Sequence, residues 1–430
     1  MEQSTIMLVI FLVAMLLSIP IALALGFAAM VTIVFISDIP PSVVIQSIYS
    51  STDNFTLMGI PFFMLAGNLM KTGGVSRRLV NFAKILVGSF PGGLGHVAIV
   101  TCMIFAAISG SGPATVAAVG LIMIPYMVEA GYDIRYASAL NAAAGGIGVI
   151  IPPSIPMVLF AVIAEVSIAE IFAAGFLPGA LIGLLLMAVN YAVSKRRGYR
   201  GEKVELSVRA FWRSFVDAFL SLMMPVIILG GIYSGIFTPT EAAGVAVVYG
   251  FVLGIFIYRE IHWRELTTIL LDSAVMSAIC IIILAMVAPF GWVLTMENFA
   301  IKIAEMMSGL FNSQFTFLLA INCFLLFWGC FVSSTAALII LTPILLPIVD
   351  ALGINIIHFG IIMVLNLELG MLTPPFGINL FIACGISKIN IEEIVKPLML
   401  FVAATLTGLF LITYVPWISL AVPRLMGLGT

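Results

Sequence analysis

Two stretches, GGIGVIIPPS at residues 145–154 and GMLTPPFGIN at residues 370–379, decide the fold that we expect for this chain. Each combines glycine with a Pro-Pro pair inside a strongly apolar segment. Glycine permits backbone conformations that other residues avoid, whereas proline lacks a backbone N–H and ends the helical hydrogen-bond ladder. Each stretch therefore predicts a helix that is interrupted along its length.

Both interrupted helices belong to a longer internal repeat. A constant step of 222 positions, for instance from 125 to 347, carries the helix breakers of one copy onto those of the other without a gap. Such a match predicts a duplicated unit of one helical hairpin and one broken helix. The matching pairs are Ser111 and Ser333, Ala114 and Ala336, Pro125 and Pro347, Gly131 and Gly353, Gly148 and Gly370, and Pro152-Pro153 and Pro374-Pro375.

The composition makes lipid the main solvent of this chain. Of its 430 residues 62% are hydrophobic and only 9% are charged, and the mean hydropathy is +1.24. A membrane-spanning helix needs about 20 mostly apolar residues, and such runs extend from Thr5–Ile36 to Pro397–Leu420. We therefore predict an all-α polytopic protein in which residues 1–430 form a single integral membrane unit. Because Thr5–Ile36 contains Pro20, this run is either one long tilted helix or two short crossings.

The repeat divides this membrane unit into three parts. Residues 96–194 form the first repeat core, and residues 266–420 form the second. Between them, residues 195–264 are expected to supply an amphipathic linker and scaffold helices. The linker, from Lys195 to Arg213, carries aromatic residues beside its basic ones, which favours a helix lying on the cytoplasmic face of the membrane.

Each repeat core contains one predicted re-entrant hairpin and one predicted broken helix. The hairpins cover residues 96–130 and 315–350, and the broken helices cover residues 138–162 and 361–386. Each hairpin segment is too long for one ordinary span and is interrupted by small residues and proline. Non-helical backbone at membrane depth is tolerated only where protein or a watery cavity satisfies its polar groups.

The basic residues predict the orientation of the two copies. They concentrate in a few connecting segments, which by the positive-inside rule face the cytoplasm. An odd number of predicted crossings separates the two copies, so the copies are inverted and their hairpins enter from opposite sides. This arrangement is typical of secondary transporters. The intervening crossings are Ser138–Val162, Ala174–Val193, Phe215–Tyr233, Ala242–Tyr258 and Leu266–Leu294.

The breaks also predict the chemistry of the site. Interrupted helices leave carbonyl oxygens without partners, and together with the hydroxyls of the hairpin tips SGSGPAT (109–115) and SST (333–335) they suit a dehydrated Na⁺ ion. The N-terminal ends of half-helices attract an anion, such as a substrate carboxylate. The alternative is that small residues and hydroxyls merely allow close helix packing. Residues expected to contact substrate are Thr115, Ser154, Thr335 and Asn379.

Several polar residues in apolar segments have two interpretations. Glu368 is an ionisable residue at membrane depth, which marks it either as functional or as a charge paired within the bundle. Asn141 and Asn366 could bind substrate or bridge helices, and Glu241 is expected to cap a helix. The five cysteines and three histidines form no metal-binding pattern.

Two other classes of function would require different residue patterns. An intramembrane enzyme would need paired catalytic groups, but the nearest pair, His358 and Glu368, stands about 15 Å apart along a helix. The sequence contains no GxxxxGK[ST] phosphate-binding loop, so ATP is not the direct energy source. A passive channel would line a path without forming a closed cation site. We therefore expect a transporter and not an enzyme.

Five segments resemble the large membrane subunit of TRAP (tripartite ATP-independent periplasmic) transporters, and the resemblance covers essentially the whole chain. It implies an elevator mechanism, Na⁺ coupling and location in the bacterial inner membrane. It also implies a small membrane subunit and a periplasmic substrate-binding protein as partners, and small organic acids such as C4-dicarboxylates or sialic acids as substrates. The segments are Ser109–Met127, Gly145–Pro156, Thr238–Gly244, Ser333–Pro347 and Gly370–Asn379.

The resemblance further implies one ion site in each repeat, built mainly from backbone carbonyls. Because Ile151 in the first copy corresponds to Thr373 in the second, we expect the two sites to differ chemically. The expected Na⁺ ligands are Ser109, Ser111, Gly148, Ile151 and Pro153 in the first repeat, and Gly329, Ser333, Gly370, Thr373 and Phe376 in the second.

Overall fold

The computed structural model describes residues 3–17, 19–37, 39–201, 207–297, 313–374 and 377–429. Within these ranges the chain is helical and contains no β-strand. Seven described helices are long and apolar enough to cross a membrane, so the prediction of an all-α polytopic membrane protein is confirmed. They are Gly112–Glu129, Ile168–Arg197, Val208–Tyr233, Pro239–Ile257, Trp263–Met296, Ser334–Ala351 and Ile391–Tyr414.

The N-terminal apolar run forms two short helices, α1 (Gln3–Leu16) and α2 (Ile21–Phe35). Pro20 stands at the N-cap of α2, where its missing N–H costs no helical hydrogen bond. The hydroxyl of Ser37 donates to Oε1 of Gln3 at 2.6 Å. This bond brings the end of α2 beside the start of α1, so the two helices are antiparallel. Of the two alternatives, the structure therefore has two short helices.

The first repeat contains a helical hairpin followed by a broken helix. The hairpin consists of α6 (Gly93–Ser109) and α7 (Gly112–Glu129), and Gly110 adopts a left-handed conformation at its tip. The broken helix consists of α8 (Ile134–Gly145), the short 3₁₀ helix η2 (Gly146–Val149) and α9 (Ile155–Ile163). The Pro-Pro stretch separates η2 from α9, as its composition predicts.

The second repeat has the same plan. Its hairpin consists of α15 (Gln314–Gly329) and α16 (Ser334–Ala351), and its broken helix consists of α17 (Ile356–Gly370) and α18 (Ile378–Ser387). The amide of Gln314 donates to the carbonyl of Leu352 at 2.6 Å, which closes the base of the hairpin. The prediction of two hairpins and two broken helices is confirmed.

The two copies match in their helix ends and in their packing. α7 and α16 begin and end at positions that differ by the same 222 residues. Ser111 and Ser333 cap these helices, and each hydroxyl accepts from the N–H three residues on, at 3.5 and 3.4 Å. The packing is reciprocal, because α18 lies against α7 while α9 lies against α16. Such an exchange indicates a pseudo-twofold relation between the repeats.

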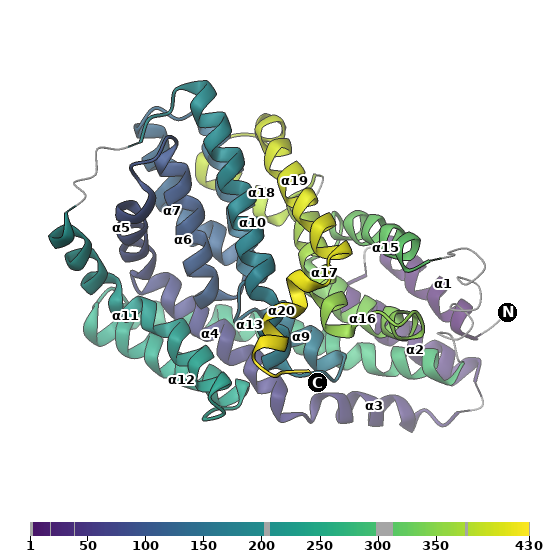
Figure 1. The fold of residues 1–430 in the computed structure, drawn as a ribbon. Coiled ribbons are helices and arrows are strands. Elements are labelled where there is room, and N and C mark those ends of the chain that lie inside the picture. The colour runs from purple at the N-terminus through teal and green to yellow at the C-terminus, as the bar shows by residue number, and fades with distance from the viewer. Residues whose placement is uncertain are drawn as a thin grey trace.

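A second group of helices borders the repeats on one side. It includes α2, α3 (Ser42–Thr52), α4 (Gly59–Thr72), α11 (Val208–Tyr233), α12 (Pro239–Phe251), which continues into the π-helix Val252–Ile257, and α13 (Trp263–Met296). In this group α4 packs against α12, and α13 packs against α2, α3 and α4. Figure 1 shows α3, α11 and α12 along the lower edge of the molecule, with α18, α19 (Ile391–Tyr414) and α10 (Ile168–Arg197) above them.

An amphipathic helix that the sequence interpretation did not anticipate, α5 (Val75–Val87), connects the two groups. It packs against α6 of the first hairpin and against α11. On one side Arg78 donates to Oε1 of Glu260 at 2.8 Å and lies over the ring of Tyr258. On the other side Lys84 donates to the hydroxyl of Tyr126 in α7.

Two further segments show where the described helices begin and end. In the linker from Lys195 to Arg213 the described ends are the last turn of α10 and the first turns of α11, and residues 202–206 lie outside the described residues. The amphipathic helix expected there stays a prediction. The apolar run Pro397–Leu420 does not form one uninterrupted helix. Val415 leaves the helical conformation, with φ −121° and ψ 79°, and α20 (Trp417–Leu425) begins after Pro416. Glu241 forms a capping box with Thr238, as predicted.

Candidate functional site

The tip of the first hairpin gathers two buried hydroxyls. Oγ of Ser109 lies 2.9 Å from Oγ1 of Thr115, and Oγ1 of Thr115 donates to the carbonyl of Ser111 at 2.8 Å. Ser109 ends α6, while Thr115 lies in the first turn of α7. The interrupted backbone between them is what allows the two hydroxyls to meet.

The break of the first helix lies directly against this tip. The carbonyl of Gly110 accepts from the N–H of Ile155 at 3.1 Å. A Cβ added to Gly148 would stand only 2.6 Å from Oγ1 of Thr115 and 2.7 Å from the carbonyl of Ser111. Only glycine permits such an approach. Ser109, Ser111, Gly148 and Thr115 are thus brought together.

Carbonyl oxygens without backbone partners accompany these hydroxyls. The carbonyls of Ile151 and Pro153 accept no hydrogen bond from a backbone N–H in the described part of the chain. Pro153 touches the hairpin tip, because a Cβ added to Gly110 would lie 2.6 Å from its oxygen. Ser154 caps α9, and its hydroxyl donates to the carbonyl of Val149 at 2.5 Å. This cluster of hydroxyls and carbonyls has the hard oxygen donors that Na⁺ requires.

The second repeat builds its junction from two glycines. A Cβ added to Gly370 would lie 2.5 Å from Cα of Gly329, so the end of α15 and the end of α17 touch backbone to backbone. Thr373 follows in the break, where its hydroxyl donates to the carbonyl of Leu369 at 3.0 Å. Ser333, four positions after Gly329 in the sequence, caps α16. Phe376, the remaining predicted ligand, lies outside the described residues.

The two junctions differ at more positions than the pair of Ile151 and Thr373. Stepping 222 positions from Ser109 and Thr115 leads to Phe331 and Ala337, which carry no hydroxyl. The second junction therefore lacks the hydroxyl pair of the first and offers the hydroxyl of Thr373 in its place. The expectation of chemically unequal sites rests on these positions as well as on the pair of Ile151 and Thr373.

A buried carboxyl lies where the two repeats meet. Glu368 is 2% exposed, and its Oε1 accepts from Nδ2 of Asn379 at 2.6 Å. A Cβ added to Gly112 would lie 2.3 Å from Oε1, and one added to Gly146 would lie 3.3 Å away. Glu368 was not among the expected ligands. The repeat step of 222 positions carries position 146 onto 368. This step is the sequence signal that could have placed Glu368 among the expected site residues.

The residues expected to contact substrate lie in different surroundings. Thr115 and Ser154 belong to the first junction, and Asn379 is bonded to Glu368. Thr335 is half-buried in the first turn of α16 and forms no hydrogen bond with the other three in the described structure. Asn366 donates to Oδ1 of Asn322 at 2.6 Å, which favours its interpretation as a bridge between α17 and α15.

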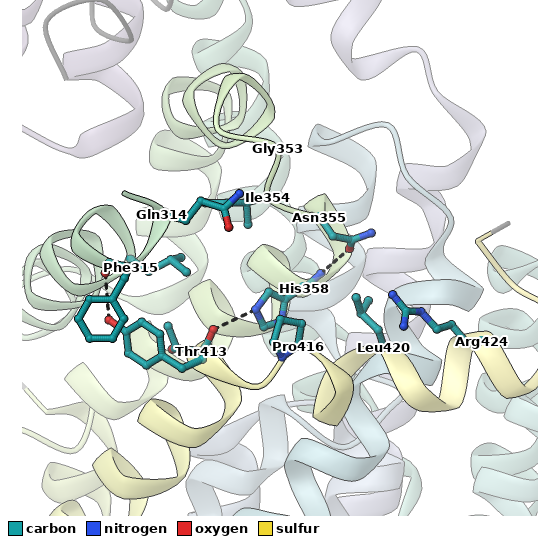
Figure 2. A pocket seen from close by; sticks show the side chains of 12 residues that line it. Gln314, Phe315, Gly353, Ile354, Asn355, His358, Thr413, Pro416, Leu420 and Arg424 are labelled. Carbon is teal, nitrogen blue, oxygen red and sulfur yellow. Dashed lines mark hydrogen bonds between the residues drawn. The ribbon is translucent and has the colours of Figure 1, made fainter. Parts of the chain in front are cut away.

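A pocket of about 400 Å³ lies away from these junctions, at the base of the second hairpin. Figure 2 shows His358 within it, bonded to the carbonyl of Thr413. Its other ring nitrogen shares a hydrogen bond of 2.6 Å with the hydroxyl of Ser419. Both nitrogens of His358 are therefore engaged in helix packing, and Glu368 does not line this pocket. In the described ranges no group of three His, Cys, Asp or Glu side chains could hold a metal ion.

Comparison with known proteins decides the family. Residues 8–418 match the family model described as "Tripartite ATP-independent periplasmic transporter, DctM component". The chain belongs to the DctM family of TRAP transporters. Members of this family are transport permeases and not enzymes, and they are multi-pass proteins of the bacterial inner membrane. TRAP large permeases work with a small permease and a periplasmic binding protein.

Relatives of this DctM-family chain carry different substrate names. It is 46% identical over 410 residues to the isethionate TRAP transporter permease protein DctMQ of Oleidesulfovibrio alaskensis, covering 95% of this chain and 65% of that protein. It is 38% identical over 429 residues to the C4-dicarboxylate TRAP transporter large permease protein DctM of Rhodobacter capsulatus, covering 96% and 97%. The chain thus spans about two thirds of the first relative and nearly all of the second.

A solved structure shares the fold of this DctM-family chain. The YdaH transporter of Alcanivorax borkumensis superposes with a TM-score of 0.64 over 88% of each chain, at 14% sequence identity. That structure was described as having an unusual topology. The likeness extends the fold of hairpins and broken helices to a transporter of distant sequence.

Proposed function

We propose that this DctM-family chain is the transport subunit of a Na⁺-coupled importer of small organic anions. The proposal rests on one observation: in each repeat the hairpin lies against the break of its own helix. In the first repeat this junction combines the hydroxyls of Ser109 and Thr115 with the carbonyls of Ile151 and Pro153, which accept from no described backbone N–H. Such a set of oxygens, beside the ends of half-helices, favours a dehydrated monovalent cation. Na⁺ is then carried as a cargo together with the substrate.

The substrate class follows from the helix ends and from the relatives. Helices α7, α9, α16 and α18 all begin at the hairpin tips or at the breaks, so their positive ends lie near the junctions. The two relatives described above are named for isethionate, a sulfonate, and for C4-dicarboxylates. A C4-dicarboxylate, a sialic-acid-like acid or a small sulfonate therefore fits the proposal. A periplasmic binding protein would deliver it, and a small membrane subunit would complete the scaffold.

An elevator motion accounts for how the substrate crosses. The hairpins and broken helices pack mainly on one another, whereas α2, α3, α4, α12 and α13 form a neighbouring group. We propose that the first group moves as a transport domain against the second. The amphipathic helix α5, which bonds to both groups through Arg78 and Lys84, would have to follow or yield during this motion.

The test is uptake by the complete transporter in lipid vesicles. The chain is reconstituted with its small subunit, and the loaded binding protein is added outside. Labelled succinate, N-acetylneuraminate and isethionate are offered under an inward Na⁺ gradient or an equal K⁺ gradient. We expect saturable uptake of one of these anions under the Na⁺ gradient and no such uptake under the K⁺ gradient. Uptake that is indifferent to Na⁺ would contradict the coupling, and flux that never saturates would favour a channel.

A further inference from the structure

Two buried oxygen atoms at the meeting point of the repeats have no hydrogen-bond partner among the described residues. They are Oε2 of Glu368 and Oδ1 of Asn379, on side chains that are 2% and 0% exposed. The other oxygen and the nitrogen of the same two groups bond to each other at 2.6 Å, so the two side chains are fixed side by side. Buried polar atoms are almost always bonded. Two unpartnered acceptors on adjoining side chains therefore indicate a ligand that both oxygens contact, either a hydrogen-bond donor or a cation.

The position of this pair is special in the pseudo-symmetry. The repeat step carries Gly146 onto Glu368, and the structure places the Glu368 carboxyl against Gly146 itself. Equivalent positions of two copies can touch only close to the axis that relates them. Space for a single carboxyl exists there because Gly146 and Gly112 lack side chains. The pair thus lies between the two repeats, with its carboxyl against the hairpin tip and the break of the first repeat.

The surroundings of the carboxyl favour a bound cation. An ionised carboxylate is an acceptor only, and burying it alone carries a large free-energy cost. No described lysine, arginine or histidine pairs with Glu368. Gly112, which touches the carboxyl, begins the 18-residue helix α7, so the positive end of that helix lies at the Glu368 side chain. A monovalent cation would then balance the single negative charge, whereas a divalent one would leave an excess charge in the apolar interior.

We propose that Oε2 of Glu368 and Oδ1 of Asn379 form an additional Na⁺ site on the pseudo-twofold axis, with ligands other than those proposed at the two hairpin junctions. This inference rests on the proposed Na⁺ coupling. It assigns a negative charge to one of three cation positions. That position depends on both repeats, because the carboxylate comes from α17 while its walls come from α7 and η2. A cation here would hold the two repeats together within the transport domain.

The test counts Na⁺ ions in the wild type and in Glu368→Gln. Equilibrium binding of labelled Na⁺ to the purified chain in lipid, and the ratio of Na⁺ to substrate during uptake by the complete transporter, are measured for both. Glutamine keeps an oxygen that can accept from Asn379 but removes the charge. We expect Glu368→Gln to bind and to carry one Na⁺ fewer than the wild type, while its uptake still requires a Na⁺ gradient. Glu129→Gln, which changes an exposed glutamate at the end of α7, should leave the count unchanged.

Other outcomes would overturn the inference. If wild type and Glu368→Gln bind equal numbers of Na⁺ while uptake stays Na⁺-dependent, the axis site is wrong and the proposed function stands. An unchanged count together with a loss of pH dependence in Glu368→Gln would assign the two oxygens to a proton instead. The wild type alone is also decisive, because the inference requires it to bind three Na⁺, one at each of the two junctions and one on the axis. Uptake without any Na⁺ requirement in either protein would instead contradict the proposed function.

Discussion

Gly329 and Gly370 meet backbone to backbone, so closely that a Cβ on Gly370 would lie 2.5 Å from Cα of Gly329. One residue ends the first arm of the second hairpin, and the other ends α17 before its break. Their contact fixes the distance between the hairpin and the break. Any side chain at this point would have to push the two elements apart.

Gly370→Ala is therefore expected to damage the second junction. The added methyl group meets the backbone of Gly329, and overpacking of this kind typically costs about 1–3 kcal/mol. We expect uptake to fall by roughly tenfold or more, since about 1.4 kcal/mol corresponds to a factor of ten. The initial rate of substrate uptake in reconstituted vesicles measures this loss. Gly385→Ala is the matched control, because that glycine also lies in a helix of the second repeat and a Cβ there meets nothing within 4 Å. Equal rates for the two variants would contradict the expected clash.

Ser109→Ala tests the hydroxyl pair of the first junction. The change removes the 2.9 Å contact with Thr115 and leaves that buried hydroxyl with the Ser111 carbonyl as its partner. Losing one hydrogen bond typically costs about 0.5–1.5 kcal/mol. We expect the Na⁺ concentration for half-maximal uptake to rise by roughly threefold to tenfold. Ser50→Ala removes an exposed hydroxyl of α3 and should leave that concentration unchanged. A rise of equal size in both variants would argue against an ion ligand at Ser109.

Much of the repeat could be predicted from sequence because its signals are local. Gly110 and Ser111 at a tip, or Pro152 and Pro153 at a break, end helices through their own backbone chemistry. The same step of 222 positions then places the second copy. Even the caps agree, since Ser111 and Ser333 act alike in the structure.

Features that depend on tertiary contacts could not be predicted in the same way. Helix α5 has an ordinary amphipathic pattern, and what it holds together is revealed by the ion pair of Arg78 with Glu260 and the hydrogen bond of Lys84 to Tyr126. The meeting of Glu368 with Gly146 requires the pseudo-twofold packing of two copies. The sequence suggested a functional acid at Glu368, but it did not indicate Asn379 as its partner.

Arg78→Lys is expected to loosen the attachment of α5. Lysine keeps the charge, but its ammonium group lacks the planar guanidinium with which Arg78 donates to both Glu260 and the Gly74 carbonyl. It also stacks less well over the ring of Tyr258. Hydrogen bonds to charged groups contribute about 1.5–3 kcal/mol, so we expect a lower melting temperature in detergent. The neighbouring Arg77→Lys changes an exposed side chain and should melt like the wild type. If Arg78→Lys melts no earlier than Arg77→Lys, α5 is held by its apolar face alone.

The opposed orientation of the two hairpins can be tested at their bases. Glu129 and Ala351 are repeat-equivalent, end α7 and α16, and are both exposed. The positive-inside rule predicts the first base in the cytoplasm and the second outside. With the exposed Cys323 replaced by serine, an impermeant thiol reagent added to intact spheroplasts should label Ala351→Cys but not Glu129→Cys. Permeabilised cells should label both. The remaining cysteines are buried and give the background. Labelling of both variants from outside would mean that the copies run in the same direction, and the pseudo-twofold axis through Glu368 and Gly146 would be lost with it.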